Sequence, residues 1–171
     1  MIAHLLSLDE ELFRRIGAFR PRWMVKAMRA LTHLGDAQSW IAIGLFLLCC
    51  GGTAARSGLL LGTSAILATL TSQALKRACC RPRPSTRLAG FVALIDNPDA
   101  FSFPSGHAAA AFAVAISLAG QGAGLGPLAL ALATAIGLSR VYLGAHFPLD
   151  VAVGAFLGCA CGALARLLVG C

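Results

Sequence analysis

The sequence predicts an all-α, polytopic membrane helix bundle with about five transmembrane helices and amphipathic interfacial helices at its N-terminus. Hydrophobic residues make up 58% of the 171 residues and charged residues only 12%, whereas about a quarter of the residues in a soluble domain are charged. Several uncharged stretches also approach the roughly 20 residues that cross a bilayer. The length fits one domain, so we expect residues 1–171 to form a single membrane-embedded unit.

Residues 1–34 carry apolar and charged side chains on opposite sides of two expected helices. In the first helix, Leu5, Leu12 and Phe13 face away from Asp9 and Arg14. Residues 22–34 repeat the pattern, with Trp23, Val25, Met28 and Leu31 set against Lys26 and Arg29. Such patterns are typical of helices that lie in the membrane interface. Residues 35–171 are then expected to form the transmembrane core.

Five apolar segments of this core are candidates for membrane spans. No charge occurs between Asp36 and Arg56, or between Arg56 and Lys76, and each gap is close to the length of a span. The chain is again uncharged from Ala108 to Ser139, which is too long for one span, and GQGAGLGP breaks it. The expected spans are residues 39–52, 58–75, 105–119, 127–143 and 148–169.

Four ends of these spans fall on the same face of the membrane. The second span ends at Lys76, the third begins at Ser105, the fourth ends near Arg140 and the fifth begins near His146. An ionisable side chain at membrane depth costs roughly 2.5–3.5 kcal/mol on the insertion scale, so it needs a partner or a function. Span counting alone therefore predicts that ionisable residues which need a partner or a function gather at one face of the membrane.

The three clusters at this face, LKRACCRPRP, PSGH and SRVYLGAHFPLD, contain groups that bind phosphate. Lys76, Arg83 and Arg140 suit a tetrahedral anion, and arginine grips phosphate oxygens with two N–H groups. Ser105 and Gly106 lie at an expected helix start, where free backbone N–H groups bind anions.

Two histidines, His107 and His146, divide naturally into a nucleophile and a general acid. Asp150 lies four residues after His146, where it can hold one imidazole nitrogen and present the other as the nucleophile. It is also the only acid within the three clusters, which are therefore too poor in carboxylates for a metal cage. These residues predict a phosphoryl-transfer site with no metal and no cofactor.

The clusters resemble the three-part signature of the type-2 phosphatidic acid phosphatase superfamily. Every fixed position is present and in order: Lys76-x6-Arg83-Pro84, Pro104-Ser105-Gly106-His107 and Ser139-Arg140-x5-His146-x3-Asp150. The span pattern extends the resemblance over most of the chain. The N-terminal segment is similar to the lead-in of small bacterial members.

The resemblance implies a role for each residue of the signature. By it, His146 forms a phosphohistidine, Asp150 orients His146, and His107 protonates the leaving oxygen. The residues that it implies for binding the phosphate are Lys76, Arg83, Ser105, Gly106 and Arg140. It also implies metal-independent catalysis and inhibition by vanadate.

Several polar residues near the site match no position of the signature. RPRP contains two Arg-Pro pairs, so Arg81 is an alternative to Arg83, although the six-residue spacing from Lys76 favours Arg83. We expect His33 and Asp36 to be interfacial. Arg77, Arg81 and Arg87 are expected to form a solvated or lipid-facing basic loop, and the roles of Cys79 and Cys80 are left open.

We expect an integral-membrane lipid phosphatase that removes a terminal phosphate from a lipid monophosphate or diphosphate. The candidate substrates are a polyprenyl diphosphate, phosphatidylglycerophosphate, phosphatidic acid and a glycolipid phosphate, which the sequence does not separate. A lipid-to-lipid phosphotransferase would use the same residues. An anion channel or transporter would line its path with the same charges, but it has no need of a nucleophile and an acid.

The expected partners are the bilayer and a lipid phosphate. The net charge of +7 points to lipid phosphate rather than to nucleic acid, and the oligomeric state is left open. The resemblance implies a bacterial inner membrane and a site on the periplasmic face, which we expect. The positive-inside rule favours a cytoplasmic site, because only Arg56 and Arg166 lie on the opposite face.

Overall fold

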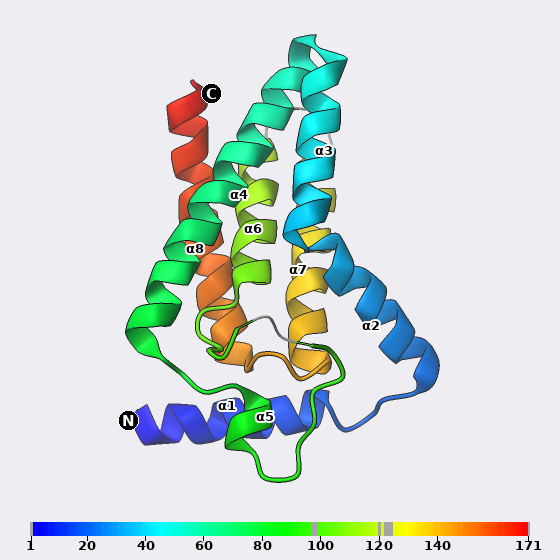
Figure 1. Cartoon of the computed structure of the whole chain (residues 1–171), viewed down its shortest axis with the longest axis vertical. Coiled ribbons are helices and arrows are strands. Elements are labelled where there is room, and N and C mark those ends of the chain that lie inside the picture. Colours follow the sequence, from blue (N-terminus) through cyan, green and yellow to red (C-terminus); the bar gives the residue numbers. More distant parts are fainter. Residues whose placement is uncertain (1, 97–98, 120, 122–124, 171) are drawn as a thin grey trace.

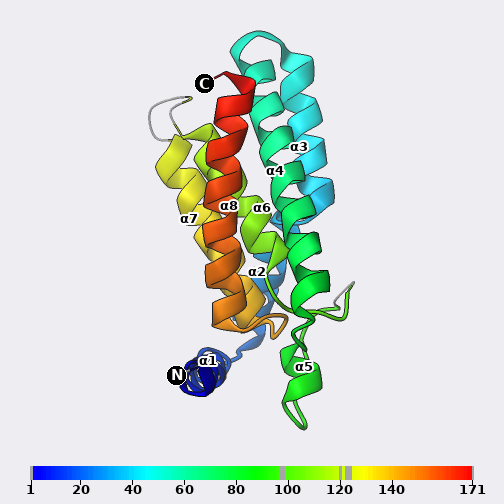
Figure 2. The same cartoon turned by 90° about the vertical axis from the view of Figure 1, so that its left-hand side faces the viewer.

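Five apolar helices run along the long axis of the molecule in the computed structural model (Figures 1 and 2). The structure describes residues 2–96, 99–119, 121 and 125–170. Every regular secondary-structure element within these residues is a helix. The five are α3 (Ala37–Cys50), α4 (Gly52–Cys79), α6 (Gly106–Leu118), α7 (Leu125–Tyr142) and α8 (Pro148–Val169). The predicted all-α membrane bundle is confirmed. Half of the residues of the predicted break GQGAGLGP lie outside the described residues.

Two helices form the N-terminal part, as predicted. α1 (Ile2–Ile16) lies across one end of the bundle, and α2 (Arg22–Leu34) runs obliquely from there to the start of α3 and packs on α7 (Figure 1). Leu5, Leu8 and Leu12 of α1 are exposed, whereas Phe13 is buried. An exposed apolar stripe on a helix at the end of a membrane bundle fits contact with the interface.

The five predicted spans are all helical but differ in length. Among the described helices, α4, α7 and α8 are long and apolar enough to cross a membrane alone. α2 and α3 qualify only together, with a bend of 53° between them, and the 13 residues of α6 are fewer than a full span needs. Length and composition therefore give three or four complete spans rather than about five. α6 is enclosed by α4, α7 and α8, and protein neighbours allow a short helix at membrane depth.

Glycines of α8 let the backbone of α6 come very close. A Cβ atom at Gly158 would lie 2.3 Å from the carbonyl oxygen of Ala109, and one at Gly162 would lie 2.4 Å from that of Ala113. Small residues at such positions allow close helix packing in membranes. The contact continues to the first residue before α6, because the N–H of Ser105 donates to the carbonyl of Asp150 at 2.9 Å. This packing sets the starts of α6 and α8 side by side.

Candidate active site

The three predicted clusters meet at one end of the bundle, where α4 and α7 end and α6 and α8 begin (Figure 1). Lys76 and Arg140 lie in the last turns of α4 and α7. Arg83 caps the short helix α5 (Pro84–Arg87), and His107 lies in the first turn of α6. His146 lies in the connection between α7 and α8. The structure therefore brings together residues that span counting placed on one face.

A groove of about 870 Å³ connects this end of the bundle to the apolar sides of α3 and α4. Its polar end is lined by predicted site residues: Lys76, Arg83, Gly106, His107, Arg140 and His146. Along α4 the groove extends from Gly58 to Lys76, a distance of about 27 Å at 1.5 Å per residue. Its shape and lining fit a lipid chain whose polar end reaches the cations.

The two ring nitrogens of His146 have different neighbours. Nδ1 lies 2.7 Å from the carbonyl oxygen of Ser102, and because a carbonyl only accepts, Nδ1 carries the proton and Nε2 is unprotonated, with a lone pair. Nε2 lies 3.5 Å from Nη1 of Arg83, on the side of the cations. Burial lowers the pKa of His146 to about 3, so the ring is neutral at physiological pH and Nε2 is available as a nucleophile.

Asp150 lies close to His146, but its hydrogen bonds go elsewhere. Its Oδ2 is 3.8 Å from Nδ1 of His146, which is too far for a hydrogen bond. The carboxylate instead accepts from the N–H of Phe147 at 2.8 Å and from Arg81 at 2.5 Å. In this structure the carbonyl of Ser102 orients His146 directly, and Asp150 holds the start of α8. Every residue has a backbone carbonyl, so the sequence could not indicate that Ser102 makes this contact.

Lys76 and Arg83 converge on Asp99, which no motif marked. Nζ of Lys76 lies 2.6 Å from Oδ2 of Asp99, and Arg83 contacts Oδ1 and donates from Nε to the backbone oxygen at 2.8 Å. The two cations are only 6% and 4% exposed, and buried cations need partners. Burial alone would raise the pKa of Asp99, but the hydrogen bonds from Lys76 and Arg83 keep it below its ordinary value. An aspartate carboxylate thus occupies an anion site.

The third cation, Arg140, and the start of α6 lie at the same polar end of the groove. Arg140 is buried and donates to Oγ1 of Thr32 at 2.7 Å. Gly106 lines the groove, whereas Ser105 is fully buried and caps α6, its Oγ 3.5 Å from the N–H of Ala108. The structure places Gly106 beside the cations, and the role of Ser105 as a phosphate ligand stays a prediction.

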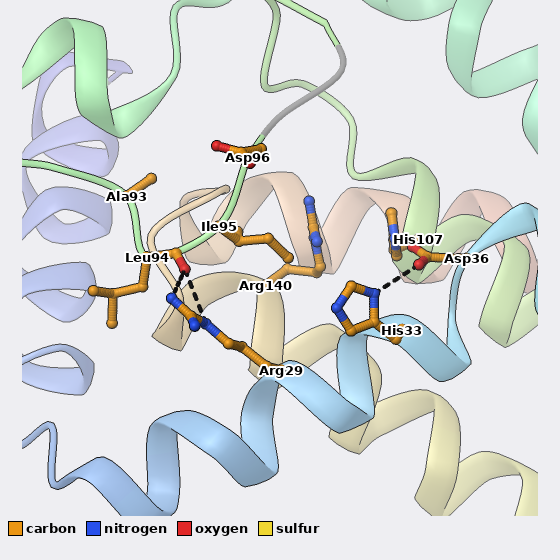
Figure 3. A pocket seen from close by; sticks show the side chains of 9 residues that line it. All are labelled: Arg29, His33, Asp36, Ala93, Leu94, Ile95, Asp96, His107 and Arg140. Atoms are coloured by element: carbon orange, nitrogen blue, oxygen red, sulfur yellow. Dashed lines mark hydrogen bonds and ion pairs between the residues drawn. The ribbon is translucent and has the colours of Figure 1, made fainter.

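A second, polar cavity of about 610 Å³ adjoins the groove on the side of α2 (Figure 3). Asp36, His107 and Arg140 line both cavities and therefore stand at their junction. Nε2 of His107 lies 2.8 Å from Oδ1 of Asp36. Asp36, which was expected to be interfacial, thus belongs to the site. The sequence signal was weak, because Asp36 lies far from His107 along the chain.

Arg81 has neither of the two roles predicted for it. Its side chain is 11% exposed and forms ion pairs with Asp9 at 2.6 Å and with Asp150 at 2.5 Å. It is therefore neither a solvated loop residue nor part of the cation cluster. Arg87 in turn pairs with Glu10 at 2.6 Å. These ion pairs fasten α1 to the loop after α4 and to the start of α8.

The arrangement can transfer a phosphoryl group. A neutral imidazole presents its lone pair beside cations that hold an anion, and a second histidine stands at the junction of the apolar and polar cavities. Among the described residues, no three His, Cys, Asp or Glu side chains converge so that they could hold a metal ion. The positive charges that contact the Asp99 carboxylate come from Lys76 and Arg83, and Arg140 lines the same groove.

Comparison with known proteins identifies relatives over most of the chain. Residues 57–170 match the profile of the PAP2 superfamily. Decaprenylphosphoryl-5-phosphoribose phosphatase of Mycobacterium tuberculosis is 35% identical over 164 residues, which cover 95% of this chain and 87% of that protein. Undecaprenyl-diphosphatase of Sulfolobus acidocaldarius is 29% identical over 154 residues, which cover 90% and 74%.

Two solved structures are similar in both fold and sequence. The crystal structure of Aquifex aeolicus LpxE has a TM-score of 0.83 and 31% identity, covering 94% of this chain and 95% of that chain. The transmembrane PAP2 type phosphatidylglycerolphosphate phosphatase from Bacillus subtilis has a TM-score of 0.77 and 27% identity, covering 96% and 86%. The resemblance drawn from the three motifs is confirmed, and with it the expected enzyme class of lipid phosphatase in a multi-pass membrane protein.

Proposed function

This chain belongs to the PAP2 superfamily, and we propose that it hydrolyses the terminal phosphate of a lipid phosphate or diphosphate through a phosphohistidine at His146. One observation carries the proposal: the groove between α3 and α4 leads from an apolar surface to buried cations and the unprotonated Nε2 of His146. A lipid in the groove presents its phosphate to Lys76, Arg83 and Arg140. The phosphate takes the place of the Asp99 carboxylate.

The reaction has two steps. In the first, the lone pair on Nε2 of His146 attacks phosphorus, the bond to the leaving oxygen breaks, and His107 gives that oxygen a proton. In the second, water attacks the phosphohistidine, its proton returns to His107, and the P–N bond breaks. The cations stabilise the negative charge that develops on the phosphoryl oxygens. No step uses a metal or a cofactor.

Polyprenyl phosphates and diphosphates are the first substrates to test. The two relatives described above are named for decaprenyl and undecaprenyl lipids, and the groove is apolar and long enough for the part of such a chain nearest the phosphate. Phosphatidylglycerophosphate, phosphatidic acid and glycolipid phosphates complete the panel. Purified protein is given each lipid in detergent and the release of inorganic phosphate is measured, with His146→Gln as the control.

The panel separates hydrolysis from phosphotransfer. Release of inorganic phosphate from at least one lipid, lost in His146→Gln, supports the proposal. A labelled phosphate that instead appears on an added lipid acceptor, with no inorganic phosphate, assigns the chain to the phosphotransferase alternative. No release and no transfer with any lipid contradicts both.

We propose that the site faces the periplasm from a bacterial inner membrane. The support is the family resemblance, and the test uses two single cysteines in an otherwise cysteine-free, active protein. Val92→Cys lies on the site face, where Val92 is 76% exposed, and Thr53→Cys lies at the opposite end, at the start of α4. Labelling of Val92→Cys but not of Thr53→Cys by an impermeant maleimide in intact cells is the expected result. The reverse pattern places the site in the cytoplasm.

A further inference from the structure

We propose that Asp36 is a positioning residue for His107 and that His33 holds Asp36 in place. The inference rests on the proposed function, in which His107 protonates the leaving oxygen. Neither Asp36 nor His33 belongs to the three clusters of the signature. His33 lies in the last turn of α2, and Asp36 lies on the short segment that joins α2 to α3. Both are far from His107 in the sequence.

The three side chains form a continuous chain of contacts at the junction of the two cavities (Figure 3). Oδ1 of Asp36 lies 2.8 Å from Nε2 of His107, and Oδ2 of the same carboxylate lies 2.9 Å from Nδ1 of His33. The exposed fraction of the side chain rises along this series of contacts, from 22% for His107 to 39% for Asp36 and 66% for His33. The carboxylate therefore links a histidine in the site to a histidine at the protein surface.

The contact decides which nitrogen of His107 faces the reaction. An ionised carboxylate only accepts hydrogen bonds, so Nε2 of His107 carries a proton toward Asp36. Nδ1 is then the nitrogen that can serve the leaving oxygen. To act as an acid, His107 must carry a proton on Nδ1 as well, and the resulting positive charge is disfavoured by Lys76 and Arg140 at the same end of the groove. A carboxylate at 2.8 Å offsets this repulsion.

The backbone of the bend is packed to make this contact. Gly35 has a φ of −87°, which any residue can adopt. Glycine is therefore needed here because a side chain would not fit, and not because of the backbone conformation. A Cβ there would lie 2.7 Å from Cγ2 of Ile136 and 3.2 Å from Cδ2 of His107. The absence of a Cβ lets the bend lie directly against the His107 ring, with Asp36 next in sequence.

The test compares substrates that need a general acid to different degrees. Asp36→Asn keeps the shape of the side chain and removes its charge. With dodecyl phosphate, whose leaving group is poor, kcat should fall by roughly 10- to 100-fold, because general acid catalysis contributes at least this much. With 4-nitrophenyl phosphate, whose leaving group needs no proton, kcat should fall by less than about threefold. KM should change little for either, because Asp36 does not hold the phosphate.

Three further variants complete the design. Asp96→Asn removes a carboxylate from the lining of the same polar cavity and should leave both rates within about twofold. His107→Gln should show the same dependence on the leaving group as Asp36→Asn, and the double variant should lose no more than His107→Gln alone, since residues that act as a unit are not additive. His33→Gln should give a smaller loss, about two- to fivefold, confined to dodecyl phosphate.

The outcomes separate this inference from the proposed function. A wild-type protein that releases no phosphate from any lipid overturns the proposed function and this inference with it. An active wild type in which Asp36→Asn slows both substrates equally, or in which the double variant multiplies the two losses, overturns the inference alone. If Asp36→Asn does not fold, His33→Gln decides, and an equal loss on both substrates is then the contradicting result.

Discussion

Replacing Asp99 by Asn should make the protein bind phosphate-like anions more tightly. In the present structure the Asp99 carboxylate is bound to Lys76 at 2.6 Å and to the guanidinium of Arg83. An incoming phosphate has to displace it from both cations. Asn has nearly the same shape and can still accept a hydrogen bond, but it carries no charge and competes less well.

The size of the effect follows from the two contacts. A hydrogen bond to a charged group contributes about 1.5–3 kcal/mol, and an amide oxygen retains part of that value. The Asp99 side chain is also 28% exposed, so solvent weakens each contact. A net gain of about 1.4 kcal/mol is a reasonable expectation, which corresponds to roughly a tenfold lower inhibition constant.

Inhibition of phosphate release by orthovanadate measures this directly. Asp99 is ionised at neutral pH because its pKa lies below the ordinary value of 3.8, so the assay can be run at pH 7. Asp96→Asn removes the same charge from the same loop and should leave the inhibition constant unchanged. If Asp99→Asn leaves the constant within twofold of wild type, or raises it, Asp99 does not compete with the anion and the reasoning is refuted.

Three other expectations concern stability, pH and metals. Gly158→Ala should lower the melting temperature by several degrees, because its Cβ would lie 2.3 Å from a backbone oxygen and overpacking costs about 1–3 kcal/mol; Gly62→Ala, with nothing within 4 Å, should not. Burial lowers the pKa of His146 to about 3, so the unfolded chain binds a proton there below pH 6.5 that the folded chain does not. The melting temperature of the wild type should therefore fall more between pH 7 and 5 than that of His146→Gln, and equal slopes would count against a neutral His146. Excess EDTA should leave phosphate release unchanged, and an activity lost to EDTA and restored by Mg²⁺ would reveal a metal that the mechanism omits.

Much of the fold follows from local properties of the sequence. The charges at Asp36, Arg56 and Lys76 bracket α3 and most of α4, because a bilayer excludes charge over a known length. The same count places the ends of α4 and α7 and the starts of α6 and α8 together, which is where the structure has the candidate site. The expected bounds of α3 and α6 are also close to the observed ones. The sequence did not predict that neither is long enough to cross a membrane alone, because a short helix surrounded by protein does not need the length that lipid demands.

The contacts that tune the site were mostly not predictable. Ser102 orients His146 through a backbone carbonyl, which any residue could supply. Asp36 and Asp99 lie on connecting segments, where no periodic pattern indicates which way a side chain points. Their partners are distant in sequence, and only the packed helices bring them within hydrogen-bond distance. Arg81 was misread for the same reason, since its partner Asp9 lies on α1.

The central claim is that His146 carries the phosphoryl group during turnover. The most direct measurement gives the purified protein a lipid labelled with ³²P in its terminal phosphate, stops the reaction at alkaline pH within one turnover, and maps the label. The account predicts label on the peptide that contains His146 in the wild type and none in His146→Gln, which should also release no phosphate. A His146→Gln protein that releases phosphate at close to the wild-type rate would contradict it.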